Sequence, residues 1–418
     1  MKIAIFGTTL YAAVTAALMA ECGHYVYICS EDLSESLDCF DIKEQDVVQA
    51  LDKQLKGPFL QYCNFASLPL DVDAYFFSYS PLDISKAFAM AEKLKLKTII
   101  HPKLMVNAST FGLKGTQKLK AILSEDDWVY LPDTVQEGQA IFSVSSASKV
   151  IIGCDDIKLE SKLKEMLRPL FPREQQYLFM PIVDAEFTKL SISGMLATRI
   201  SYMNDLAVVA EKLGIDISNV RDGMAADSRI GAAYLYAGAG FGGENFSHDI
   251  LTLSNTIAGT GIKSRLLDQV WEINEQQKEF LFRKLWNYFH GDLAGKTVAI
   301  WGASFKVNTS STHFSPIHIM LEALWAQGVK VRLHDPQALD EILEYYGDRE
   351  DLTLCADQYQ AADGAHALCI LTAWKQYWSL DYQQLKTAMR HPLILDGRNI
   401  YQPDYVKGQG FAYMGVGR

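Results

Sequence analysis

Short apolar runs alternate with helical stretches at both ends of the chain, and this alternation constrains the fold more than any other feature. In the N-terminal part, helices are expected at Leu10–Glu21 and Ile84–Leu94. Strands are expected around them, at Met1–Phe6, Tyr25–Cys29, Ala74–Ser78, Thr98–Ile100, Val129–Leu131 and Lys149–Ile152. Strands and helices that alternate in this way are typical of an α/β fold with a doubly wound parallel sheet.

The middle of the chain has helical periodicity instead. Apolar residues recur at helical spacing over Glu186–Leu213, and Leu251–Trp286 lacks turn residues apart from Gly259–Gly261. Strands resume in the last third, at Lys296–Gly302, Val329–Leu333 and Ala367–Leu371. Because 418 residues exceed what one core holds, we expect three parts. These are a Rossmann-like domain over 1–183, a helical region over 184–290 and a second α/β domain over 291–418.

Charge and cysteine content exclude several classes of protein. Thirty-nine basic and fifty acidic residues give a net charge of −11, which disfavours binding to nucleic acid or anionic lipid. The seven cysteines are scattered without a C-x-x-C pair, so neither a disulfide framework nor a metal site is expected. The apolar stretch from Lys2 to Ala20 resembles a signal peptide, but Gly7–Thr9 interrupts it and Glu21 follows it. No membrane association is expected, and a cytoplasmic location is the simpler interpretation.

The turn after the first expected strand has the position of a dinucleotide-binding G-x-G-x-x-G motif. Gly7 fills the first glycine position, Thr9 the second and Ala12 the third. A side chain at Thr9 stands where the backbone normally approaches the pyrophosphate. After the second strand, Ser30 and then Glu31 stand where an acidic residue would hold the ribose hydroxyls. Two interpretations stay open: a turn that binds NAD, and a Rossmann-type turn that has lost or weakened its cofactor.

A second glycine-rich loop, Gly238–Gly243, contains four glycines in six residues and lets backbone approach a ligand closely. It is followed by Asn245, His248 and Asp249. Upstream, Lys189 and Ser193 are four residues apart and share one face of the expected helix.

Several stretches occur in the order found in a known family. They are AEFTKLSISGMLATRISYMND from Ala185, DSRIGAAYLYAGAGFGGENFSHDI from Asp227, GASFKVNTSSTHFSP from Gly302, LPDTVQEGQA from Leu131, LDGRNIY from Leu395 and GFAYMGVGR from Gly410. With them the chain resembles the UDP-glucose 6-dehydrogenase family, which includes GDP-mannose dehydrogenases. The resemblance implies an NAD-type N-terminal domain, a central helical dimerisation region and a C-terminal nucleotide-sugar domain.

The resemblance also implies how the catalytic positions are filled. Members of the family oxidise a sugar alcohol to a carboxylate in two NAD-dependent steps, the second through a thiohemiacetal on a cysteine. Asn245 stands at that cysteine's position, and a carboxamide is not a useful nucleophile. Ser193 replaces a family asparagine, and His248 replaces a family lysine. Three catalytic-type residues persist: Lys189, Asp249 and Thr110.

Binding positions follow by the same resemblance. The substrate positions are Asp133, Arg229, Tyr234, Gly242, Gly243, Lys306 and Arg398. The cofactor positions are Gly7, Thr9, Ser30, Glu31, Ser80 and Pro81. Substrate positions are thus mostly kept, whereas the redox positions are mostly altered.

Three functional hypotheses follow. The first is an NAD-dependent nucleotide-sugar oxidoreductase, acting on a UDP-sugar, with altered or truncated chemistry and no thiohemiacetal step. The second is a catalytically inactive nucleotide-sugar-binding homologue that acts as a regulator or as the partner of an active dehydrogenase. The third is a non-redox reaction with His248 and Asp249 as an acid–base pair. A dimer is the expected assembly: a homodimer, or alternatively a pair with an active dehydrogenase.

Overall fold

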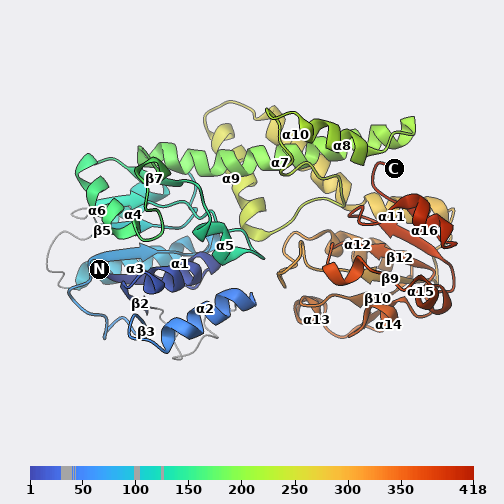
Figure 1. Cartoon of the computed structure of the whole chain (residues 1–418), viewed down its shortest axis with the longest axis horizontal. Coiled ribbons are helices and arrows are strands. Elements are labelled where there is room, and N and C mark those ends of the chain that lie inside the picture. Colours follow the sequence, from blue (N-terminus) through green and yellow to red (C-terminus); the bar gives the residue numbers. More distant parts are fainter. Residues whose placement is uncertain (30–39, 41, 43, 98–103, 124–126) are drawn as a thin grey trace. The chain divides into compact units, whose positions relative to one another are not determined.

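The computed structural model describes residues 1–29, 40, 42, 44–97, 104–123 and 127–418. The chain forms two units, Met1–Ile192 and Ser193–Arg418, and the division falls inside the longest helix, α7 (Ile182–Leu213). Each unit contains its own sheet (Figure 1). The three-part division expected from the sequence stays a prediction.

The sheet of the first unit has the strand order β3-β2-β1-β4-β5-β6-β7-β8. Neighbouring strands are parallel except β6 and β7, which run antiparallel, so the last two strands extend a parallel Rossmann-type sheet in the opposite direction. The strands are β1 (Lys2–Phe6), β2 (Tyr25–Cys29), β3 (Leu60–Cys63), β4 (Ala74–Phe77), β5 (Leu104–Asn107), β6 (Asp127–Tyr130), β7 (Val150–Cys154) and β8 (Tyr177–Met180).

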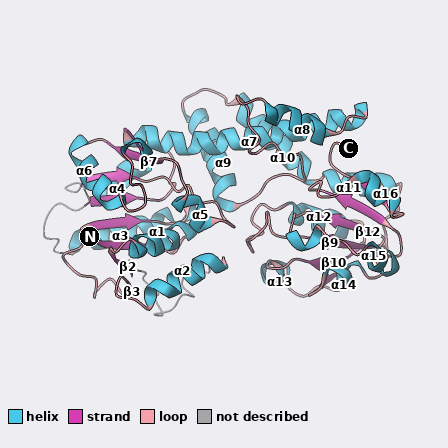
Figure 2. Cartoon of the chain, viewed as in Figure 1, coloured by secondary structure: helices cyan, strands magenta, loops and turns pink. Residues whose placement is uncertain are grey.

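Helices cover both faces of this sheet, as Figure 2 shows for the described part of the unit. One face packs against α1 (Leu10–Glu21), α2 (Gln45–Leu55), α5 (Ala140–Ser145) and α6 (Glu160–Leu167). The other packs against α3 (Ile84–Leu96) and α4 (Gly115–Ile122). Strands buried on both faces need apolar residues throughout, and β1 and β4 (AYFF) supply them.

The second unit begins with helices and ends in a sheet. After α7 come α8 (Ile217–Ala226), α9 (Glu244–Gly259), α10 (Arg265–Lys278) and α11 (Phe280–Tyr288). The sheet has the order β11-β10-β9-β12-β13-β14, and all its neighbouring strands are parallel. Its strands are β9 (Thr297–Trp301), β10 (Lys330–His334), β11 (Leu352–Leu354), β12 (Ala367–Ile370), β13 (Leu393–Asp396) and β14 (Ala412–Met414).

This second sheet is also doubly wound. One face packs against α11, α12 (Pro316–Trp325) and α13 (Leu339–Tyr346). The other packs against α14 (Gln358–Ala362), α15 (Tyr382–Ala388) and α16 (Pro403–Gly408). The predicted fold class, two Rossmann-like α/β domains with a helical central region, is therefore confirmed.

Most of the expected elements are present. The strand expected at Tyr25–Cys29 and the helix expected at Leu10–Glu21 have the predicted bounds. The strand expected at Thr98–Ile100 lies outside the described residues. Several strands were not predicted from the sequence: β3, β5, β8, β11, β13 and β14. No helix in the described residues is long and apolar enough to cross a bilayer.

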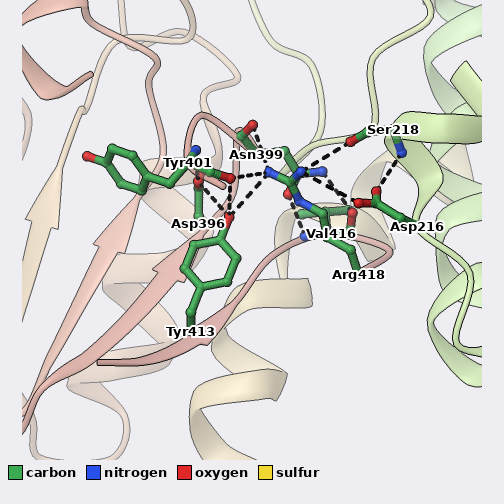
Figure 3. A network of polar contacts seen from close by, with 8 residues as sticks. All are labelled: Asp216, Ser218, Asp396, Asn399, Tyr401, Tyr413, Val416 and Arg418. Carbon is green, nitrogen blue, oxygen red and sulfur yellow. Dashed lines mark hydrogen bonds and ion pairs between the residues drawn. The ribbon is translucent and has the colours of Figure 1, made fainter. Parts of the chain in front are cut away.

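A buried arginine ties the C-terminal segment to the rest of the second unit. The Arg418 side chain, 6% exposed, donates to the carbonyl oxygens of Tyr401 at 2.6 Å and Asn399 at 2.9 Å. It also donates to the Ser218 hydroxyl at 3.3 Å, at the start of α8 (Figure 3). Beside it, the fully buried Asp396 carboxylate accepts from the Tyr413 hydroxyl and the Tyr401 amide. Arg418 thus joins α8 to the loop that follows β13.

We predict that Arg418→Met lowers the free energy of unfolding by about 3 kcal/mol, because buried carbonyl oxygens lose a charged donor. Arg229→Met is the matched control, since the Arg229 side chain is 87% exposed and pairs with Asp227, two residues away. The control is expected to cost less than about 1 kcal/mol. Urea denaturation of both variants measures the difference, and equal losses would contradict a structural role for Arg418.

Candidate functional site

The turn after β1 lies at the point where the strand order of the first sheet reverses, between β1 and β4. Open α/β sheets bind ligands at this place. Gly7 has a φ of +99°, and a Cβ atom there would overlap the carbonyl group of Ser78, directly after β4. Both the backbone conformation and the close approach therefore require glycine at position 7.

Thr9, by contrast, fits its position without strain. It is the N-cap of α1 with a φ of −69°, a conformation that any residue adopts. Its hydroxyl lies 2.7 Å from the Ser78 hydroxyl and accepts a hydrogen bond from the Ala12 amide at 3.1 Å. An N-terminal amide group of the helix, of the kind that binds phosphate in dinucleotide sites, is thereby paired with the protein itself.

The structure describes two of the other predicted cofactor positions, Ser80 and Pro81. Ser80 precedes a single 3-10 turn, Pro81–Asp83, and its hydroxyl accepts from the Leu82 amide at 3.3 Å. Ser30 and Glu31 lie outside the described residues. The strand–turn–helix backbone thus has the form of a dinucleotide-binding turn, and the Thr9 hydroxyl pairs with the Ala12 amide at its helix end.

Thr110, 8% exposed, lies in a loop held by a network of buried polar groups. The Glu186 carboxylate, at the start of α7, accepts from the Lys114 amide at 2.6 Å and the Thr116 amide at 2.8 Å. The Thr116 hydroxyl donates to Glu186 at 2.7 Å and accepts from the Asn107 amide group at 2.8 Å. Burial raises the pKa of Glu186, although these hydrogen bonds act in the opposite direction.

The network continues toward the cofactor turn. The carbonyl oxygen of the Asn107 side chain accepts from the Ser109 amide at 3.0 Å. The Ser109 hydroxyl donates to Phe77 O at 2.9 Å and accepts from the Tyr79 amide at 2.8 Å. A series of hydrogen bonds between buried or half-buried groups therefore leads from Thr9 and Ser78, beside Gly7, to Glu186 near the start of α7. Lys189 lies about one helical turn further along the same helix.

Asp133 follows β6 and accepts from the Val135 amide at 2.9 Å. The pKa of Tyr11, in the first turn of α1, is raised mainly by burial and also by the negative charge of Asp133. Asp133 and the first turn of α1 are therefore near each other within the first unit.

In the second unit, the glycine loop Gly238–Gly243 is held by three carboxamide side chains. Gly238 donates to the Asn204 side chain at 2.8 Å and accepts from Gln277 at 2.8 Å. Asn274 accepts from the Phe241 amide at 2.8 Å and donates to the Phe241 carbonyl at 3.2 Å. All three clamping residues are buried, so the path of the loop is fixed by α7 and α10.

The far end of the loop is closed by tight packing. A Cβ atom at Gly242 would lie 2.6 Å from Phe314 O, and one at Gly243 would lie 2.9 Å from the Phe305 ring. Gly243, with a φ of +96°, donates to His313 O at 2.8 Å and is the N-cap of α9. The two predicted glycines therefore let α9 begin against the loop that follows β9.

The first turns of α9 carry three of the residues predicted at catalytic positions. Asn245 and Asp249 are four residues apart and share a face of the helix, with His248 beside them. Asp249 is 1% exposed and accepts from the Ser193 hydroxyl of α7 at 2.7 Å. His248 is half-buried, whereas Asp249 is buried.

The Arg398 side chain is hydrogen-bonded to backbone carbonyl oxygens of the protein. Its guanidinium donates to Leu371 O at 2.5 Å, Gly240 O at 3.3 Å and Phe305 O at 3.3 Å. Burial lowers its pKa to about 10, so the group stays charged at neutral pH. Arg398 thus joins the glycine loop to the loop after β9, where Lys306 lies 5.3 Å from the ring of Phe305.

Two residues predicted to bind the substrate, Arg229 and Tyr234, precede the glycine loop in the sequence. Arg229 is exposed and pairs with Asp227 two residues away. Tyr234 is half-buried with a φ of +60°, an unusual conformation for a bulky residue.

The second sheet repeats the turn geometry of the first. Gly302 follows β9 with a φ of +99°, and a Cβ atom there would lie 2.5 Å from the Thr372 amide nitrogen after β12. Asp335, after β10, is 2% exposed and accepts from the Ala303 amide at 2.7 Å and the Trp374 indole at 3.0 Å. A second nucleotide-binding type of turn is therefore present in the described residues.

Some of these positioning residues were missed from the sequence. They are Glu186, Asn274, Gln277 and Asp335. Asn274 and Gln277 lie at buried positions of α10, where apolar residues are the rule. A carboxamide at a position that the helical spacing assigns to the buried face is the sequence feature that could have identified them. Among the described residues, no group of three or more His, Cys, Asp or Glu is placed to hold a metal ion.

Comparison with known proteins identifies the family. Residues 183–276 match the central domain of the UDP-glucose/GDP-mannose dehydrogenase family, and residues 299–403 match its UDP binding domain. UDP-glucose 6-dehydrogenase from Pseudomonas aeruginosa is 32% identical, over 100% of this chain and 98% of the relative. The chain belongs to the UDP-glucose/GDP-mannose dehydrogenase family.

Solved structures of the family agree with this assignment. A UDP-glucose dehydrogenase from Pyrobaculum islandicum superposes with a TM-score of 0.88 at 26% identity, over 100% of this chain and 97% of that one. A UDP-D-ManNAc dehydrogenase from Pyrococcus horikoshii has a TM-score of 0.82 at 19% identity, covering 100% and 99%, and shares the fold.

We predict that Glu186→Gln lowers the free energy of unfolding by about 2–3 kcal/mol. Each carboxylate oxygen accepts from a different amide, and the NH₂ group of glutamine cannot accept from either. Glu174→Gln is the control, because the Glu174 side chain is 80% exposed and pairs with Lys164 at the surface. Denaturation curves of the two variants provide the measurement, and a loss below about 0.5 kcal/mol for Glu186→Gln would show that the network is not fixed by its charge.

Proposed function

We propose that this chain binds a UDP-sugar and uses NAD to oxidise one of its alcohol groups to a carbonyl, without the thiohemiacetal step. The observation that carries the proposal is the arrangement on α9. The Asp249 carboxylate is buried and held by Ser193, while Asn245 lies on the same face one turn earlier. A base is kept at the start of the helix, and the position of the nucleophile holds a carboxamide.

Alcohol oxidation needs a base and a hydride acceptor but no thiol. Asp249 is an oxygen acceptor near the end of an ordered glycine loop, suited to orient a water molecule or a substrate hydroxyl. Lys189, one turn before Ser193 in α7, and Thr110, on the loop held by Glu186, are the other candidate catalytic residues. A bound nicotinamide would supply the hydride acceptor.

UDP is favoured as the nucleotide because the UDP binding domain of the family matches residues 299–403. Within that range, Phe305 and Lys306 follow the glycine turn at Gly302, and Arg398 contacts both this loop and the glycine loop. Arg398 is therefore proposed to act through the shape of the loops, and Lys306 to bind a phosphate.

A second candidate is a UDP-sugar-binding protein without turnover, acting as a regulator or as the partner of an active dehydrogenase. The Thr9 hydroxyl favours it, because that hydroxyl already pairs with the Ala12 amide at the helix start. Loss of one amide donor weakens the anion site that NAD requires.

Calorimetry and an absorbance assay for NADH separate the two candidates. The proposal predicts that UDP-glucose and NAD both bind, with Kd values of roughly 1–100 μM, and that NADH forms with a member of a UDP-sugar panel. GDP-mannose is the control for nucleotide choice. UDP-sugar binding with no NAD binding would establish the second candidate, and the absence of any nucleotide-sugar binding would overturn both.

Two variants sharpen this experiment. Asp249→Asn keeps an acceptor for Ser193 but removes the base, so turnover should fall by about 100-fold or more while UDP-sugar binding changes little. Asn245→Cys restores a thiol at the start of α9. We expect no uronic acid from Asn245→Cys, since Thr9 still alters the cofactor turn, and measurable acid would show that the turn is competent.

We also propose that α7 mediates self-association. Apolar side chains lie on one stripe of this helix, at Met195, Tyr202, Leu206, Val209 and Leu213. Successive members of the stripe are seven, four, three and four residues apart. All but the half-buried Leu206 are strongly exposed, from 51% at Tyr202 and Val209 to 66% at Leu213. Helices with such a seven-residue pattern pack against a partner helix, and a second copy of this chain offers the same stripe.

Tyr202→Glu combined with Val209→Glu is therefore predicted to convert a dimer into a monomer, because two carboxylates would face the apolar stripe of the other copy. Light scattering coupled to gel filtration measures the mass. Leu96→Glu is the matched control, an 86% exposed leucine at the end of α3, and should leave the mass unchanged. A wild-type monomer at micromolar concentration would refute self-association.

A further inference from the structure

Two cysteines lie opposite each other at one edge of the first sheet. Cys29 ends β2 and Cys63 ends β3, and the two residues are register partners in neighbouring parallel strands. β3 is the edge strand. Both side chains belong to the same apolar cluster, with Phe6 and Phe77, so they lie on one face of the sheet. Both are reduced thiols.

Their spacing suits a covalent bond. Neighbouring strands lie about 4.8 Å apart, and disulfides join residues whose Cα atoms are roughly 4.4–6.8 Å apart. Side chains of register partners point to the same side of the sheet, which brings the two sulfur atoms together. The Cys63 side chain is half-buried at the edge, whereas Cys29 is fully buried.

The surroundings of Cys63 favour its thiolate. A hydrogen bond with Cys29 lowers the pKa of Cys63, and the positive charge of Lys97 lowers it further, while burial acts in the opposite direction. Lys97 is fixed nearby, because its ammonium group donates to Phe65 O and Leu68 O at 2.8 Å each. Burial instead raises the pKa of four other cysteines: Cys22, Cys154, Cys355 and Cys369.

We propose that Cys29 and Cys63 form an oxidation site that closes reversibly to a disulfide in the presence of a peroxide. This property is independent of the proposed function. The Cys63 thiolate attacks hydrogen peroxide, which gives a sulfenic acid and hydroxide. The Cys29 thiol then attacks the sulfenic sulfur, the disulfide forms and water leaves. Two electrons pass from the two thiols to the peroxide, and a dithiol reductant reverses the step.

Peptide mapping under non-reducing conditions tests the proposal. The full chain is treated with a small excess of hydrogen peroxide, and we expect a loss of two thiols per chain, a linked Cys29–Cys63 peptide and recovery with dithiothreitol. Cys63→Ser should abolish the link and leave Cys29 unmodified, because Cys29 is fully buried. Cys154→Ser is the matched control, a half-buried cysteine whose thiol donates to Asp156 O, and should form the link normally.

Alkylation of the untreated protein gives a test that does not depend on folding of a variant. Cys63 is expected to react with iodoacetamide about tenfold faster than Cys154 at neutral pH, since the thiolate is the reacting form. The proposal is overturned if peroxide links Cys63 to another cysteine, if the oxidation stops at single-cysteine products, or if Cys154 reacts as fast as Cys63.

Discussion

In each unit, the loop after the central strand of the sheet approaches the loop after the neighbouring strand so closely that only glycine fits. Gly7 meets the backbone of Ser78 in the first sheet, and Gly302 meets Thr372 in the second, each with a φ of +99°. This contact brings the carboxyl ends of the two strands together at the reversal of strand order, where such sheets bind ligands. The loops that carry Thr9 and Lys306 start from these two glycines.

The loops themselves are ordered by buried polar side chains rather than by apolar packing. Glu186 holds the loop after Thr110, and Asn274 with Gln277 holds the glycine loop. A buried polar group is costly unless it is paired, so each network permits one loop path and penalises alternatives. Positioning residues of this kind fix the backbone path of a loop independently of the side chains that the loop exposes.

The sequence predicted the two sheets, the long helix and the family, because apolar periodicity and motif order are local properties of the chain. It did not predict the clamps, since the partners of Glu186 lie about seventy residues earlier, at Lys114 and Thr116. Short strands such as β11 (LTL) were missed because three residues carry too little periodicity. The pairing of Ser193 with Asp249 likewise depends on how α7 packs against α9.

Thr9 and Asn245, two positions at which the resemblance implies a different residue, have different structural settings. Thr9 adopts an ordinary N-cap conformation and pairs with Ser78 and Ala12, so its side chain caps the start of α1. Asn245 stands on the face of α9 that Asp249 shares, in a regular helical position. Neither side chain requires an unusual backbone conformation, whereas a side chain at Gly242 or Gly243 would overlap Phe314 O or the Phe305 ring. The path of the glycine loop therefore depends on these two glycines and on the buried clamps, and it does not depend on which side chain stands at position 245.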